Sequence, residues 1–199
     1  MNKREFFKKG LLGIGAMVLA EKMKALEYYP LPSDKKWAVL YGTWCGSSRD
    51  AGIWISEGMN GIANVFDVRE DPDLSTYDHL VIGGSIRIGR VPKELQDYVN
   101  KNREVLKPKI RGLYVVCGNR RQPPGPEQKV SLIDNHLARL CGVSSVPSQV
   151  FLGRITYGLM DENSRKMIQG MNEPEYDNLK RTECMAFGRG LLAGFTSSS

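Results

Sequence analysis

The sequence holds little of what metal centres and nucleophilic enzymes require. Its 199 residues include four cysteines and two histidines. No two cysteines form a Cys-x-x-Cys pair, and the histidines add no ligand spacing, which excludes a zinc or iron–sulfur site of the usual kind. Nor does any Ser/His/Asp or Cys/His arrangement indicate nucleophilic catalysis. We therefore expect no metal and assign no catalytic side chain, so any chemistry would belong to a bound organic cofactor.

Positive charge is present but is unevenly distributed. The net charge is +6, yet the first 25 residues hold six of the 28 basic side chains and two of the 22 acidic ones. The rest of the chain is close to neutral, and no stripe of interleaved basic and aromatic residues runs along it. We therefore expect no nucleic acid partner.

The chain also lacks an apolar run of about 20 residues, the length that crosses a bilayer as a helix. Its mildly apolar stretch at residues 10–20 follows a basic head, a layout typical of a signal peptide. The string KREFFKKG resembles a twin-arginine export signal, with Lys3 and Arg4 where two arginines are usual. An amphipathic or disordered N-terminal arm is the alternative interpretation.

These features predict three regions. Residues 1–25 form a signal or membrane-anchoring segment, residues 26–35 a linker rich in proline and charge, and residues 36–199 one folded domain. We expect a periplasmic or membrane-associated protein at a membrane surface, with the cytoplasmic face of the membrane as the alternative.

Apolar runs alternate with amphipathic helical patterns throughout the predicted domain, as in parallel α/β sheets. Five strands and four helices suit a doubly wound five-stranded parallel sheet of order 2-1-3-4-5, whose ligands bind at the carboxyl ends of the strands. The expected strands are residues 37–42, 63–68, 79–84, 113–117 and 149–155. The expected helices are residues 48–60, 93–106, 127–140 and 178–195.

Small-residue loops follow the first and third of these strands. The first strand runs into GTWCGSSRDA, where hydroxyls and backbone N–H groups precede a helix. Such groups at a helix N-terminus favour an anion, so this loop is a candidate phosphate site. The third strand runs into VIGGSIRIGRVPKELQDYVNKN, and both loops would meet at the sheet's switch point.

The first loop resembles the phosphate loop of flavodoxins. The second resembles the Ile-Gly-x-Ser-Ile-Arg-x-Gly turn of a flavodoxin-like subgroup, the menaquinone-dependent protoporphyrinogen oxidases, and the likeness continues weakly through FLGRITYG. This resemblance implies a flavodoxin-like fold with FMN as cofactor. The residues it assigns to the cofactor are Thr43, Trp44, Cys45, Gly46, Ser47 and Ser48 around the phosphate, Gly84, Ser85, Ile86, Arg87, Ile88 and Gly89 against the ring, and Gly118, Asn119 and Arg120 in the third loop.

One position departs from that pattern. The subgroup tends to place a tyrosine where Ile88 stands, and the third loop offers no aromatic residue to stack on a flavin. Trp44 is a substitute if its side chain turns inward, but it also fits a surface or partner-facing role.

Arginines cluster on the loops predicted to surround the site. A planar guanidinium binds a carboxylate with two parallel hydrogen bonds, so this cluster fits an anionic substrate, an acidic protein or anionic lipid. Solvated loop arginines are the alternative. The residues of this predicted rim are Arg87, Arg90, Arg120 and Arg121.

The resemblance implies an FMN-dependent oxidoreductase that passes hydrogen or electrons from a reduced substrate, such as a porphyrinogen, to a quinone. An exported electron carrier that serves a redox partner protein is the second interpretation. A binding module without flavin is the third.

Overall fold

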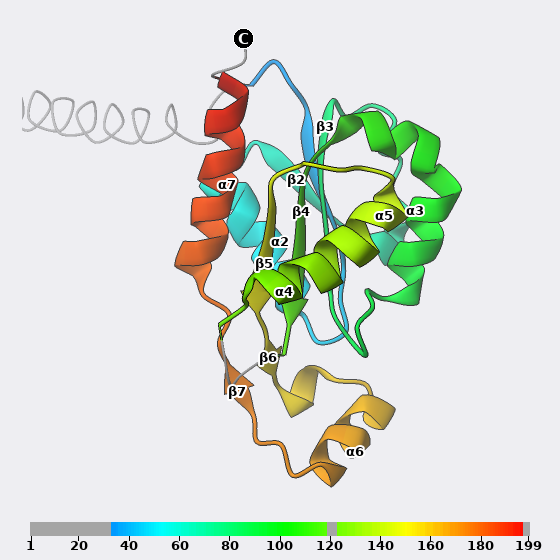
Figure 1. Cartoon of the computed structure of the whole chain (residues 1–199), viewed down its shortest axis with the longest axis vertical. Coiled ribbons are helices and arrows are strands. Elements are labelled where there is room, and N and C mark those ends of the chain that lie inside the picture. The colour runs from blue at the N-terminus through cyan, green and yellow to red at the C-terminus, as the bar shows by residue number, and fades with distance from the viewer. Residues whose placement is uncertain (1–32, 119–122, 197–199) are drawn as a thin grey trace, which may run out of the picture. The chain divides into compact units, whose positions relative to one another are not determined.

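Five parallel strands form the sheet at the centre of the folded unit (Figure 1). The computed structural model describes residues 33–118 and 123–196. The strand order is β2-β1-β3-β4-β5, which confirms the predicted doubly wound topology. The strands are β1 (Trp37–Gly42), β2 (Ala63–Asp67), β3 (His79–Ser85), β4 (Ile110–Cys117) and β5 (Ser148–Leu152).

The sheet separates two hydrophobic cores. Successive side chains of a strand point to opposite faces, so Ala38 and Leu40 belong to one core while Val39 and Tyr41 belong to the other. Every residue of β1 is buried. This burial on both faces explains why the strand reads as a continuous apolar run rather than an alternating one.

Helices cover both faces. One core includes buried residues of α3 (Lys93–Leu106) and of the helix over residues 126–141; the other includes residues of α2 (Ser47–Gly58) and α7 (Arg181–Thr196). The helix over residues 126–141 has three parts. They are α4 (Pro126–Lys129), the π-helical η3 (Val130–Ala138) and α5 (Arg139–Cys141).

Three predicted boundaries were wrong by three residues, and several others differ from the structure by one or two. β4 begins at Ile110 rather than residue 113, because the half-buried Arg111 interrupts the apolar pattern while its guanidinium donates to the carbonyl of Pro108. The predicted strand 149–155 is broken at Gly153, whose N–H donates to the carbonyl of Cys117 at 2.6 Å. α7 begins at Arg181 rather than residue 178, since the Asp177 carboxylate accepts the Leu179 N–H and holds a turn.

We call residues 153–180 the β5–α7 segment. The sequence analysis predicted no helix or strand between residues 155 and 178. The segment contains β6 (Arg154–Ile155), η4 (Tyr157–Leu159), α6 (Glu162–Gly170) and β7 (Tyr176–Asp177). β6 and β7 pair antiparallel. Short 3-10 turns lie elsewhere, at η1 (Val68–Glu70) and η2 (Lys107–Lys109).

Across residues 33–118 and 123–196, no helix combines the length and the apolar character needed to span a membrane. The predicted signal segment, residues 1–25, lies outside the described residues.

Candidate functional site

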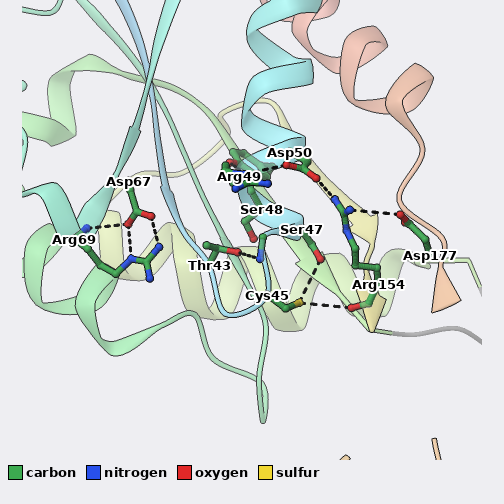
Figure 2. Close-up of polar contacts among 12 residues, drawn as sticks. Thr43, Cys45, Ser47, Ser48, Arg49, Asp50, Asp67, Arg69, Arg154 and Asp177 are labelled. Atoms are coloured by element: carbon green, nitrogen blue, oxygen red, sulfur yellow. Dashed lines mark hydrogen bonds and ion pairs between the residues drawn. The ribbon is translucent and has the colours of Figure 1, made fainter. Parts of the chain in front are cut away.

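The loop between β1 and α2 folds into a tight turn ahead of a helix. Gly46 adopts the left-handed region at φ +81°, where a side chain would be strained, and its N–H donates to the Thr43 hydroxyl at 3.0 Å (Figure 2). The side chains of Ser47 and Ser48 are buried at the first turn of α2. The structure thus brings together the predicted phosphate-loop residues around one helix N-terminus.

This helix N-terminus is open to an anion. The first N–H groups of a helix have no intrahelical partner, and no side chain caps α2 at Gly46. The Ser48 hydroxyl is fully buried and has no hydrogen-bond partner within the described residues. A buried hydroxyl without a partner carries a free-energy penalty, so this donor set fits a phosphate group that would satisfy it.

Tyr114, on β4, positions the start of α2. Its buried hydroxyl donates to the carbonyl of Ser48 at 2.9 Å, and burial raises the pKa of Tyr114 well above its ordinary value, so the donor keeps its proton. The ring lies where a Cβ on Gly83 would stand, at 2.2 Å. Sequence reasoning assigned Tyr114 only to a strand, because the contact joins positions 66 residues apart.

The loop after β3 lies against the first loop. The Ser85 hydroxyl accepts the Trp44 N–H at 3.1 Å, so the two predicted cofactor loops are joined directly. Further on, Arg87 and Arg90 exchange two backbone hydrogen bonds across a turn whose central residues have φ values of +50° (Ile88) and +71° (Gly89). A branched residue such as Ile88 is strained in that region, and its side chain is 89% exposed.

His136 holds the end of this loop. Its Nε2 accepts the Val91 N–H at 3.0 Å, so the imidazole must be neutral for the bond to form. His136 lies in the π-helical part of its helix, a rare conformation that is frequent at functional sites. Burial lowers the pKa of His136, and the nearby charge of Arg90 lowers it further.

We expect acid to destabilise this contact. Since the folded-state pKa of His136 lies below its unfolded value, its contribution is complete above about pH 6.5 and declines as pH falls toward the lowered pKa. Urea unfolding of wild type and His136→Gln between about pH 7.5 and pH 5 should show a smaller loss of stability in the variant. Burial also lowers the pKa of His79, so some dependence of the free energy of unfolding on pH should remain in the variant. Identical slopes in both proteins would contradict this assignment.

A cavity of about 220 Å³ opens at the carboxyl ends of the strands. Its volume is just below the range of about 300 to 1,000 Å³ usual for small-molecule sites, and apolar side chains form most of its wall. Three loops and the β5–α7 segment line it. The residues in these loops or at the adjoining ends of their strands and helix are Trp44, Cys45, Ser47, Ser85, Ile86, Arg87, Val116, Cys117 and Gly118. The segment contributes Gly153, Arg154, Ile155, Met160, Ser164, Met167, Ile168 and Tyr176.

The predicted arginine rim looks different in the structure. The Arg87 guanidinium donates to the Ser164 hydroxyl at 2.8 Å and lies 5.3 Å from the centre of the Trp44 ring. It thus bridges the second loop to α6 and is half-buried. Arg90 is exposed, whereas Arg120 and Arg121, like Asn119, lie outside the described residues.

Two aromatic residues line the cavity. Trp44 does so from the phosphate loop with 36% of its surface exposed, so its side chain faces both the cavity and solvent. Tyr176 lines it from β7, and its hydroxyl donates to the carbonyl of Gly118 at 3.0 Å. The sequence analysis considered only the loops and did not identify Tyr176, which comes from a segment distant in sequence.

The cysteines fall into two groups. Burial raises the pKa values of Cys141 and Cys184 to about 12, so both are neutral thiols of the cores. Cys45 and Cys117 line the cavity, and the Cys45 thiol contacts the carbonyl of Arg154 at 3.7 Å. None of the four forms a disulfide, and the described part of the chain holds no cluster of side chains that could bind a metal ion.

Comparison with known families agrees with this geometry. The flavodoxin domain family model matches residues 38–181, so the chain belongs to that family. A comparison with curated protein sequences found no match.

Solved structures show the same fold at low sequence identity. Oxidised flavodoxin 1 from Bacillus cereus is 15% identical, with 79% of this chain and 97% of that chain covered and a TM-score of 0.51. The Flv1 flavodiiron core from Synechocystis sp. PCC6803 is 12% identical, with 93% of this chain and 42% of that chain covered and a TM-score of 0.54. At these identities the likeness establishes the fold alone.

Proposed function

We propose that this flavodoxin-domain protein binds FMN at the carboxyl edge of its sheet and acts as an FMN-dependent oxidoreductase. The observation that carries the proposal is the open N-terminus of α2, with the partnerless Ser48 hydroxyl, beside a largely apolar cavity. Family membership supports FMN as the cofactor. FMN, when bound, supplies reversible transfer of hydrogen or electrons.

The chain's own residues would bind and orient the cofactor. Thr43, Gly46, Ser47 and Ser48 would hold the phosphate through hydroxyls and backbone N–H groups, which are strong donors to a charged acceptor. The loop residues 84–89 and Gly118 would flank the ring, as the resemblance predicts. The hydrogen bond from the Trp44 N–H to the Ser85 hydroxyl fixes the position of the two loops relative to each other.

The wall opposite these loops bears on the reaction partner. Met160, Met167 and Ile168 line the cavity from the β5–α7 segment, and apolar and thioether side chains adapt to flat organic molecules. This wall supports a quinone as the electron acceptor. A porphyrinogen remains the substrate that the sequence resemblance implies, and Arg90 is the exposed arginine of the described residues on the predicted rim.

Anaerobic reoxidation tests the proposal. The full chain is loaded with FMN, photoreduced with EDTA as the electron donor and mixed with a water-soluble naphthoquinone while flavin absorbance is followed. Rapid reoxidation with one quinone consumed per flavin supports the oxidoreductase. A reduced flavin that the quinone does not reoxidise contradicts the proposal and favours the electron carrier. A chain that binds no FMN favours the flavin-free binding module.

We further propose that residues 1–25 direct the protein to the periplasm or the membrane surface. The basic head and short apolar stretch of the sequence support this localisation. Exchange of Lys3 and Arg4 for glutamine should leave the protein in the cytoplasm on fractionation of the cells. Unchanged export would contradict the twin-arginine interpretation.

A further inference from the structure

A buried guanidinium links α2 to the β5–α7 segment. Arg154, on β6, pairs with Asp50 in the first turn of α2, and its other terminal nitrogen lies 3.6 Å from the Asp177 carboxylate on β7 (Figure 2). The Arg154 side chain is 13% exposed, whereas Asp177 is 51% exposed. The Asp50 pair is therefore the better shielded of the two.

Asp50 is an unfavourable neighbour for a phosphate. It lies in the first turn of the helix whose N-terminus the phosphate group would approach. A carboxylate and a phosphate within one helical turn of each other repel strongly when water is excluded. A second arginine, Arg49, also contacts Asp50, at 3.1 Å, but its side chain is 53% exposed and solvent screens its charge.

Arg154 also carries a buried hydrogen-bond donor that has no partner in the described part of the chain. Its Nε is buried without a partner within the described residues, as is the Ser48 hydroxyl. Arg154 lines the cavity together with Ser47 and Cys45, and the Cys45 thiol contacts its carbonyl. Arg154 thus lies beside the predicted phosphate loop, although it comes from a segment that the loop sequence does not contain.

We propose that Arg154 is a positioning residue for phosphate recognition: by neutralising Asp50 it makes the site selective for FMN over riboflavin. The inference rests on the proposed FMN site and adds a charged residue from outside the phosphate loop. It also makes FMN affinity depend on the packing of the β5–α7 segment against α2, because Arg154 lies in that segment and pairs with Asp50 of α2.

The comparison of two flavins tests this role, because riboflavin lacks the phosphate and shares the ring. Dissociation constants of the full-length wild type and Arg154→Gln are measured for FMN and riboflavin by quenching of flavin fluorescence. FMN affinity should fall at least about tenfold, while riboflavin affinity changes by less than about threefold. Equal losses for both flavins would mean that Arg154 only supports the fold, and would overturn the proposal.

Asp50→Asn supplies the decisive second variant. In the Arg154→Gln background it should restore FMN affinity to within about threefold of wild type, because the repelling charge is gone. Alone, Asp50→Asn should raise the affinity for FMN and leave the affinity for riboflavin unchanged. This single variant tests the proposal even if Arg154→Gln does not fold. No rescue, or no change in FMN affinity with Asp50→Asn alone, overturns the proposal.

Arg49→Gln is the matched control. It removes the other guanidinium on Asp50 from an exposed position, so FMN affinity should change by less than about threefold. A wild type that binds neither flavin refutes the FMN site itself. A wild type that binds FMN, together with an Arg154→Gln variant that loses affinity equally for FMN and riboflavin, refutes only the role of Arg154.

Discussion

Thr43→Asp is expected to weaken FMN binding by about a hundredfold or more. An aspartate can still accept the Gly46 N–H that Thr43 accepts at 3.0 Å, so the turn before α2 is retained. The carboxylate adds a negative charge beside the proposed phosphate position. At about 4 Å and an effective dielectric constant of 20, one such charge pair costs about 4 kcal/mol, which exceeds the hundredfold effect.

Thr43→Asn separates charge from shape. Asparagine has nearly the size of aspartate and keeps an acceptor for Gly46, so FMN affinity should change by less than about tenfold. Both variants are titrated with FMN by absorbance, and their thermal unfolding is compared without FMN to confirm that the fold is intact. Equal affinities in the two variants would remove this loop from the phosphate site.

Gly188→Ala is expected to reduce the free energy of unfolding by about 3 kcal/mol or more. A Cβ on Gly188 would stand 2.2 Å from the carbonyl oxygen of Ile55 in α2. The reciprocal contact is as close, because a Cβ on Gly58 would lie 2.2 Å from the carbonyl oxygen of Met185. Backbone atoms cannot rotate away, so α2 and α7 would have to separate.

Gly190→Ala is the matched variant on the same helix. A Cβ there meets nothing within 4 Å, and alanine is a better helix former than glycine, so stability should rise by about 0.5 to 1 kcal/mol. Urea unfolding monitored by circular dichroism measures both variants. Opposite signs are the expected result, and equal small effects would contradict the close helix contact.

Much of the fold could be predicted from the sequence because the central strands are buried on both faces. β1 and β3 are buried along their whole length and give unbroken apolar runs. α3 was predicted with its correct bounds, since its buried residues, among them Leu95, Val99 and Leu106, recur at helical spacing. The order of the strands is the one expected of a doubly wound sheet, which the alternation of strands and helices suggests.

The β5–α7 segment could not be predicted, for a physical reason. Its strands have two residues each and α6 has nine, so periodicity has little to act on. Long-range polar contacts hold it instead: Arg87 bonds Ser164 across 77 residues, and Arg154 pairs with Asp50 across 104. The loop before α2 is local in sequence, so its place between a strand and a helix could be predicted, whereas the residues that lie beside it from this segment could not.

Titration of the purified full-length protein with FMN, followed by its visible absorbance and fluorescence, tests the central claim most directly. We expect saturation at one FMN per chain, a shifted flavin spectrum and quenched fluorescence, with riboflavin bound more weakly. A protein of intact fold that leaves the FMN spectrum unchanged at excess cofactor would contradict it.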